Sequence, residues 1–188
     1  MSSSETQILI AGGGPVGMSL AIDAALRGLD VTILEQRAAG APPSTKCNTV
    51  ASRTLETFRR FGVADQVRAS GLPDDFPTDW LITLSLNGPE LGRIRLPSRA
   101  ERSEPSFPDS DWATPEPMVR ASQLYIEPIL YDRMRELPGV RILNSTRLTG
   151  FEQDEAGVIG RCVGPDGAEQ EIRARFLIGC DGGRSTVR

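Results

Sequence analysis

The stretch QILIAGGGPVG, residues 7–17, decides the fold of this 188-residue chain. Residues 7–11 form a short and nearly continuous apolar run, which is typical of a parallel strand covered on both faces. Residues 18–26 carry apolar side chains at helical spacing, and Gly28 supplies a helix stop. Between these segments, the spacing GxGxxG is met by Gly12, Gly14 and Gly17. Strand, glycine-rich turn and helix therefore follow each other in the order that dinucleotide-binding folds use.

A second apolar run at residues 31–34 completes a βαβ unit, and Glu35 stands at its carboxyl end, 18 positions beyond Gly17. At that position a carboxylate accepts hydrogen bonds from both hydroxyls of an adenosine ribose. The glycines permit a tight turn, close approach of a pyrophosphate and close helix packing. Because Glu35 would repel a 2′-phosphate, the unit predicts FAD or NAD rather than NADP. A plain strand-to-helix turn beside a solvated Glu35 is the structural alternative.

Composition narrows the possible functions of the chain. Its net charge is −4, which argues against nucleic acid or an anionic membrane as a partner. It has no histidine, which excludes the usual general base, the Ser-His and Cys-His nucleophile pairs and the commonest zinc ligand. Neither a disulfide framework nor a metal site is expected from three cysteines without CxxC spacing, Cys47, Cys162 and Cys180. With no signal peptide and no membrane-spanning run, we expect a soluble cytoplasmic protein.

The middle of the chain changes character after a loop from Ala38 to Asn48. Helical patterns first predict two short helices, at residues 54–61 and 63–68. Residues 71–117 then contain eight prolines and two alternating strand patterns, 81–86 and 93–96. This composition predicts an inserted β segment with long loops.

Helix and strand patterns return after residue 117. A helix is expected at residues 122–137, where Pro128 marks the first turn or a kink. Two apolar runs predict buried strands, 140–143 and 176–180. Three further patterns predict a small antiparallel meander, 148–152, 158–163 and 169–173. Together these elements place the chain in the α/β class.

Two distant segments resemble a known family. Residues 10–17 and the string GCDGGRSTVR, residues 179–188, are similar to the FAD-dependent aromatic hydroxylases of the para-hydroxybenzoate hydroxylase type, the class A flavoprotein monooxygenases. The second segment resembles the cDGxxSxVR motif of that family, which is more specific than GxGxxG. Residues 53–62 and 120–124 resemble two further stretches of its FAD-binding part. The resemblance implies a Rossmann-like FAD-binding domain of the glutathione-reductase type, incomplete, with a β segment inserted from a substrate domain.

The resemblance also implies a division of the chain by function. Residues 1–70 would be the first segment of the FAD-binding domain, 71–117 a partial substrate-domain insert, and 118–188 the second FAD-binding segment. Enzymes of this family run to roughly twice this length or more, beyond an ordinary single domain, and no GDAxH-like segment occurs in this sequence. We therefore expect an N-terminal fragment, a truncated product or one piece of a split enzyme, inactive by itself.

The resemblance assigns contacts with the adenosine and pyrophosphate parts of FAD to two turns. Gly12, Gly14 and Gly17 would line the pyrophosphate, and Glu35 would hold the adenosine ribose. The expected cofactor-binding set also includes neighbours of these residues, namely Pro15, Val16, Gln36 and Arg37.

Four residues farther along the chain complete the expected set. Gln123 would meet the flavin side of the cofactor, and Asp181 would lie near its ribityl-pyrophosphate part and contribute to the use of NAD(P)H. Lys46 or Arg53 would match a basic residue that reaches FAD; spacing from Gly62 favours Lys46, whereas the local string favours Arg53. As alternatives, Asp181 closes a turn after a strand and Gln123 is a polar residue at a helix start.

In this family the flavin carries the chemistry, with NADH or NADPH as reductant, and an oxygen atom reaches a phenol-like ring. The resemblance thus implies the FAD-binding N-terminal portion of a monooxygenase that hydroxylates phenolic or polyketide aromatic substrates, and identifies no catalytic residue. Expected partners are a small aromatic substrate and a complementary C-terminal half, or further copies of the chain through uncovered apolar edges. A non-catalytic nucleotide-binding or interaction module with the same fold is the alternative. An NAD-dependent dehydrogenase ranks last, because it leaves the Asp181-Gly182 motif unexplained.

Overall fold

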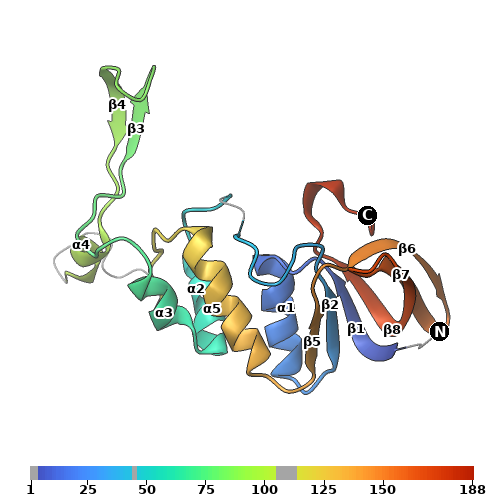
Figure 1. Cartoon of the computed structure of the whole chain (residues 1–188). Helices are drawn as coiled ribbons and strands as arrows, with labels where there is room; N and C mark the ends of the chain where they lie inside the picture. Colours follow the sequence, from blue (N-terminus) through green and yellow to red (C-terminus); the bar gives the residue numbers. More distant parts are fainter. Residues whose placement is uncertain (1–3, 44–45, 105–113) are drawn as a thin grey trace. The chain divides into compact units, whose positions relative to one another are not determined.

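Figure 1 shows the computed structural model of the chain, which describes residues 4–43, 46–104 and 114–188. The chain forms two compact units. The first comprises Met1–Ser44 and Ile126–Arg188, and the second comprises Thr45–Tyr125. These boundaries reflect compactness, so the division by function at residues 70 and 117 stays a prediction.

The first unit is built on a six-stranded sheet with the order β5-β2-β1-β8-β7-β6. Its strands are β1 (Ser4–Ala11), β2 (Val31–Leu34), β5 (Val140–Leu143), β6 (Arg147–Asp154), β7 (Gly157–Val163) and β8 (Glu169–Gly179). The first four strands in the sheet order run parallel, and β7 and β6 continue the sheet antiparallel. The strands expected at 31–34 and 140–143 are confirmed, and β1 begins at Ser4 instead of Gln7.

The βαβ unit predicted from the glycine-rich stretch is confirmed. Helix α1 (Pro15–Ala25) follows β1 and packs against β1, β2 and β5. Its buried residues include Met18 and, one helical turn later, Ala21 and Ile22. All of β2 is buried, since helix and sheet residues cover it from both sides. Burial on both faces explains why these strands are continuous apolar runs rather than alternating ones.

The meander strands supply the second side of this core. Leu9, Ala11 and Leu34 form one buried cluster with the inward residues of β6, β7 and β8, namely Leu148, Val158, Cys162, Ile172 and Ala174. Gly160 of β7 lies directly against Leu9, because a Cβ at position 160 would come within 2.6 Å of the Leu9 Cδ2 atom. The alternation of buried and exposed residues along β7 follows from the period of two in a strand.

Helix α5 (Gln123–Arg135) confirms the helix expected at residues 122–137. Pro128 lies inside this helix rather than in its first turn. Ile126, Leu130 and Met134 are buried at a spacing of four residues, so one stripe of the helix faces the apolar core.

Strand β8 corrects two expectations. The meander strand predicted at 169–173 and the last strand predicted at 176–180 are one continuous strand, Glu169–Gly179. Its first half pairs with β7 as far as Ala174, and β1 pairs with it as far as Gly179. The second half was also expected to be buried, but Phe176 is 58% exposed. Its apolar sequence resembled a covered strand, whereas among the described residues only β1 pairs with this part of β8.

In the second unit, helices α2 (Ser52–Phe61) and α3 (Ala64–Ala69) confirm the two predicted short helices. Gly62 ends α2 in the left-handed conformation, with a φ of 80°. This conformation favours glycine, because a Cβ would crowd the following carbonyl. Leu55, Phe58 and Phe61 form the buried stripe of α2.

The predicted β insert is a hairpin with shorter and shifted strands. β3 (Trp80–Thr83) pairs antiparallel with β4 (Glu90–Ile94), whereas the strands were expected at 81–86 and 93–96. Leu84 and Leu86 lie in the connection and are 81% and 100% exposed, so their apolar pattern did not reflect burial. Figure 1 shows this hairpin in green.

The short helix α4 (Arg99–Ser103) was not predicted. A capping box starts it, since Ser98 accepts from the Glu101 backbone N–H and the Glu101 carboxylate accepts from the Ser98 N–H. The spacing Ser-x-x-Glu, met by Ser98 and Glu101, is the sequence pattern of a capping box and indicates a helix start. Throughout the described part of the chain, no helix combines the length and apolar character needed to cross a bilayer.

Candidate cofactor-binding site

Three loops meet at one edge of the sheet in the first unit. Register pairs Ala11 at the end of β1 with Leu34 of β2 on one side and Gly179 of β8 on the other. The residues that follow each strand, starting with Gly12, Glu35 and Cys180, therefore emerge side by side. In open parallel sheets, ligands bind in the crevice beyond the carboxyl ends of two neighbouring strands whose following connections run in opposite directions.

The glycine turn is held closely between the neighbouring strands. Gly12 has a φ of 103°, and a Cβ there would overlap the carbonyl of Cys180. Its N–H donates to the Leu34 carbonyl at 2.8 Å, and the Cys180 N–H donates to the Ala11 carbonyl at 2.7 Å. A Cβ at Gly17 would overlap the Gly12 carbonyl, so α1 approaches the turn only because residue 17 is glycine. The two glycine-containing motifs of the sequence are thus in direct contact.

Gly14 differs from these two glycines because a Cβ there would meet no atom within 4 Å. It is the N-cap of α1, and Pro15 occupies the first turn. Among the residues that the structure describes, no side chain caps this helix end, and its first turn contains no acidic residue. Val16 is exposed beside it. The backbone N–H groups and the positive end of the helix dipole are therefore available to an anion such as a phosphate.

Glu35 is only 6% exposed and is fixed by both of its carboxylate oxygens. Oε2 accepts from the Gly13 N–H at 2.7 Å, and Oε1 accepts from the Arg37 N–H at 2.8 Å and the Arg37 Nε at 3.1 Å. The carboxylate is therefore oriented against the glycine turn instead of being solvated at the surface. Gln36, between these two residues, is exposed.

Arg37 joins Glu35 to a second buried carboxylate, Glu127 of α5. Arg37 Nη1 donates to Glu127 Oε2 at 3.1 Å, and Glu127 is 5% exposed. The hydrogen bond to Glu35 raises the pKa of Arg37 above its ordinary value, although partial burial opposes this change. Sequence analysis missed Glu127; its signal is an acid placed directly after Ile126 on the buried side of a helix.

Asp181 is half-buried at the end of β8. Its Oδ2 accepts from the Thr186 N–H at 2.6 Å, and its Oδ1 is buried without a hydrogen-bond partner among the described residues. Burial raises the pKa of Asp181, but hydrogen bonds from Ser185 and the backbone outweigh it, so the pKa lies below its ordinary value. The carboxylate is therefore charged at neutral pH and has one oxygen available to a donor.

A cavity of about 200 Å³ lies beside the Glu35 and Arg37 side chains. It is lined from α1, the loop after β2, α5 and the end of β5, by residues that include Met18, Pro42, Pro43, Tyr131, Ile142 and Asn144. The loop after β5 is tied to the loop after β2, because the Ser145 N–H donates to the Arg37 carbonyl at 3.0 Å. This volume is below the roughly 300–1,000 Å³ of a pocket for a whole drug-sized ligand, so it suits one part of a larger molecule.

Three predicted residues belong to the second unit. Lys46 is exposed in the loop before α2, and Arg53 is exposed in the first turn of α2. Gln123 is 7% exposed at the start of α5, and its N–H donates to the Cys47 carbonyl at 2.9 Å. The structure brings Gly12, Gly14, Gly17, Glu35, Arg37 and Asp181 to one edge of the first unit, and the roles of the three residues of the second unit stay predictions.

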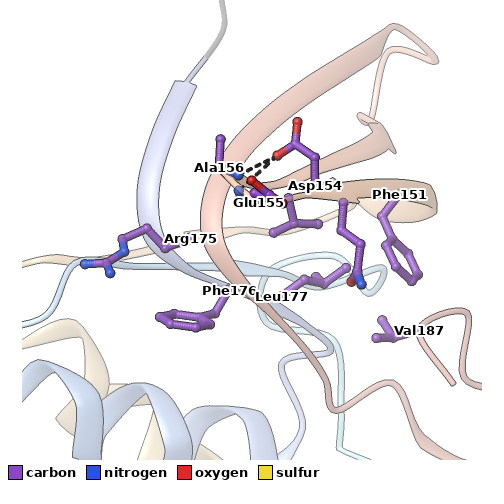
Figure 2. A pocket seen from close by; sticks show the side chains of 11 residues that line it. Phe151, Asp154, Glu155, Ala156, Arg175, Phe176, Leu177 and Val187 are labelled. Atoms are coloured by element: carbon purple, nitrogen blue, oxygen red, sulfur yellow. Dashed lines mark hydrogen bonds between the residues drawn. The ribbon is translucent and has the colours of Figure 1, made fainter.

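A second cavity, of about 500 Å³, follows the part of β8 beyond its pairing with β7 (Figure 2). Phe151, Phe176, Leu177 and Val187 contribute apolar side chains to its lining, and the turn from Asp154 to Gly157 also lines it. Asp154 shapes that turn, since its Oδ1 accepts from the N–H groups of Ala156 at 2.8 Å and Gly157 at 3.1 Å (Figure 2). Gln153, Glu155 and Arg175 also line the cavity, so these residues form an uncovered surface that is only partly apolar.

A sheet with four parallel strands that carries a glycine turn, an acid placed to bind a ribose and a second glycine loop at one edge defines a Rossmann-type dinucleotide-binding domain. Comparison with known proteins gives the family: the chain belongs to the FAD binding domain family, which matches residues 5–188. The predicted resemblance and fold class are confirmed.

The relatives of the chain include named hydroxylases. It is 33% identical to the 2,4-dichlorophenol 6-monooxygenase of Cupriavidus pinatubonensis, over 97% of this chain and 30% of that protein. It is 34% identical to aklavinone 12-hydroxylase RdmE of Streptomyces purpurascens, over 100% of this chain and 35% of that protein. The flavin-dependent monooxygenase PieE, solved with FAD and substrate, matches with a TM-score of 0.86 and 27% identity, over 100% of this chain and 32% of PieE. The chain thus spans about a third of the length of these relatives.

The residues at the sheet edge fit FAD. The open side of Gly14 and the uncapped end of α1 suit a pyrophosphate. Asp181 suits a hydroxyl-bearing part of the cofactor, because a buried carboxylate oxygen without a partner accepts a hydrogen bond from a hydroxyl but repels a phosphate.

Proposed function

We propose that this chain binds FAD and forms the FAD-binding part of an NAD(P)H-dependent monooxygenase that hydroxylates phenolic or polyketide aromatic substrates. The observation that carries this proposal is the hydrogen bond from the Gly13 N–H to buried Glu35. It joins the glycine turn, which is proposed to bind the pyrophosphate, to the acid that is proposed to bind the ribose. The names of the relatives, which act on a chlorophenol and on aklavinone, support the substrate class.

The adenosine half of FAD lies along the loops after β1 and β2 in this proposal. The N–H groups at Gly14 and at the start of α1, with Pro15 and Val16 around them, hold the pyrophosphate. Glu35 accepts hydrogen bonds from the ribose hydroxyls, and the cavity beside Arg37 receives the adenine ring. Its apolar lining from Met18 and Tyr131 suits the faces of a base.

For the flavin half, Asp181 of the first unit accepts a hydrogen bond from the ribityl chain in this proposal. In the second unit, Gln123 is proposed to contact the flavin side, and Lys46 or Arg53 is proposed as the basic residue that reaches FAD. When bound, FAD supplies the redox chemistry that, with NADH or NADPH as reductant, places an oxygen atom on an aromatic ring. The contribution of this chain is to bind and orient the cofactor. In this proposal a cytoplasmic location is favoured by the use of NADH or NADPH and by the free cysteines Cys47, Cys162 and Cys180.

Substrate binding requires a further polypeptide in this proposal, equivalent to the other two thirds of the relatives. The uncovered surface beside Phe176 and the exposed apolar residues of the β3–β4 hairpin support such a partner, because large exposed apolar patches mark interaction sites. Without that partner, the same surfaces favour self-association.

The test is to co-express the chain with the C-terminal two thirds of aklavinone 12-hydroxylase RdmE, or of other relatives, and to assay the purified pairs. Bound flavin together with NAD(P)H oxidation stimulated by an aromatic substrate is the expected result. Flavin binding without NAD(P)H oxidation in every pairing would overturn the monooxygenase proposal in favour of a non-catalytic nucleotide-binding module.

A further inference from the structure

Arg37 contacts two carboxylates that are both almost completely buried. Its backbone N–H and Nε donate to Glu35, and its Nη1 donates to Glu127 Oε2 at 3.1 Å. Glu35 and Glu127 are 6% and 5% exposed, respectively. Two buried carboxylates at one site stay charged only if a cation and hydrogen bonds compensate their lost hydration. Arg37 is the cation that both share.

Glu127 also determines where the Arg37 guanidinium lies. The Ala38, Ala39 and Gly40 residues that follow Arg37 are exposed. The hydrogen bond to Glu127 ties the loop after β2 to α5, across 90 positions of sequence. Because the guanidinium is planar, an anchored Nη1 also fixes the direction of Nε, which donates to Glu35 Oε1. The orientation of the Glu35 carboxylate therefore depends on Glu127.

We infer that Glu127 is a positioning residue that acts through Arg37 to orient Glu35 toward the ribose hydroxyls of the cofactor. This inference rests on the proposed function. A carboxylate that accepts from two adjacent hydroxyls must present its oxygens at a defined angle, since hydrogen bonds weaken steeply when misaligned. Removal of the Glu127 charge leaves Glu35 in place but releases the guanidinium that sets this angle.

The test compares ADP with 2′-deoxy-ADP, which lacks one hydroxyl that Glu35 would bind. Isothermal titration calorimetry on the full chain gives both dissociation constants. A hydrogen bond to a charged group predicts that wild type prefers ADP by about 10- to 100-fold. We expect Glu127→Gln, which keeps the shape of the side chain, to reduce this preference to about threefold or less.

Two further variants separate positioning from general damage. Arg37→Lys keeps the positive charge but loses the planar fork, so it is expected to lose the same preference for ADP. Glu136→Gln is the matched control, because Glu136 is exposed and pairs with Arg133 on the surface. It is expected to keep the wild-type preference. Circular dichroism and thermal unfolding show which variants are folded.

The outcomes distinguish the inference from the proposed function. If wild type binds neither nucleotide, the proposed function fails. If wild type prefers ADP and folded Glu127→Gln keeps the full preference, the proposed function stands and the positioning role is overturned. If Glu127→Gln does not fold, the Arg37→Lys preference decides in the same way.

Discussion

The backbone N–H of Gly13 donates a 2.7 Å hydrogen bond to the carboxylate of Glu35, 22 positions later in the chain. A Cβ at residue 13 would come within 3.0 Å of Glu35 Oε2, so the side chain of Glu35 lies directly against the glycine turn. This contact joins the ends of β1 and β2 into one surface. The contact supports a site in which one ligand spans both loops.

Two glycines of the turn, Gly17 and Gly14, predict effects of different size for the same substitution to alanine. Gly17→Ala places a methyl group against the Gly12 carbonyl, so we expect a loss of about 2–3 kcal/mol in the free energy of unfolding. Gly14→Ala adds a methyl group that meets nothing within 4 Å, so stability should change by less than about 1 kcal/mol. Urea unfolding of both variants tests this difference. Equal losses at the two positions would contradict the geometry of the turn.

Removal of the cation between Glu35 and Glu127 is expected to destabilise the fold. In Arg37→Met, the two buried carboxylates lose the positive charge and the guanidinium hydrogen-bond donors that they share. The variant should therefore lose about 1–3 kcal/mol at pH 7, less than a fully buried pair because the Arg37 side chain is 31% exposed.

Urea unfolding of Arg37→Met and wild type at pH 7 checks this prediction. Equal free energies of unfolding would show that Arg37 does not compensate the two carboxylates.

The elements around the nucleotide turn could be predicted because their signals are local. Residues 7–17 and Glu35 encode a strand, a turn and an acid within one βαβ unit, and β2 begins and ends where its apolar run does. The Arg37–Glu127 pair could not be predicted in this way, because it joins residues 90 positions apart. The position of Glu127 in an apolar stretch of a helix indicates a buried ion pair only when its partner, Arg37, is known.

The pattern of apolar residues also failed to predict burial in segments that pair with few neighbouring strands. Residues 176–180 have the composition of a covered strand, yet Phe176 is exposed because pairing with β7 stops at Ala174. In the hairpin, Leu84 and Leu86 extend the strand pattern beyond the paired residues. The sequence identifies apolar residues, whereas their burial depends on which strands pair with the segment that carries them.

The low pKa of Asp181 predicts how this residue contributes to stability. A carboxylate whose folded pKa lies below its ordinary value of 3.8 stabilises the protein above that pH, and the contribution disappears as pH falls through the folded pKa. Wild type should therefore be more stable than Asp181→Asn at neutral pH, and the difference should shrink as the pH falls from 7 through the ordinary value of 3.8. Thermal unfolding of both proteins over this range measures it. A difference that grows toward acid would contradict the low pKa.

The uncovered surface beside β8 predicts self-association of the isolated chain. Phe176 is 58% exposed at the cavity shown in Figure 2. Replacing it with aspartate should shift wild-type oligomers toward monomer, since a charge opposes edge-to-edge association. Sedimentation equilibrium measures the shift. Leu26→Asp, at an exposed apolar residue after α1, is the control and should leave association unchanged; a monomeric wild type would contradict the prediction.

FAD binding by the purified chain tests the central claim most directly. Flavin fluorescence is titrated with wild type and with Gly14→Ala, whose added methyl group stands where the pyrophosphate would approach the start of α1. We expect saturable binding of one FAD per chain by wild type and at least about tenfold weaker binding by the variant. No saturable binding by wild type, or the same dissociation constant for both proteins, would contradict an FAD site at this turn.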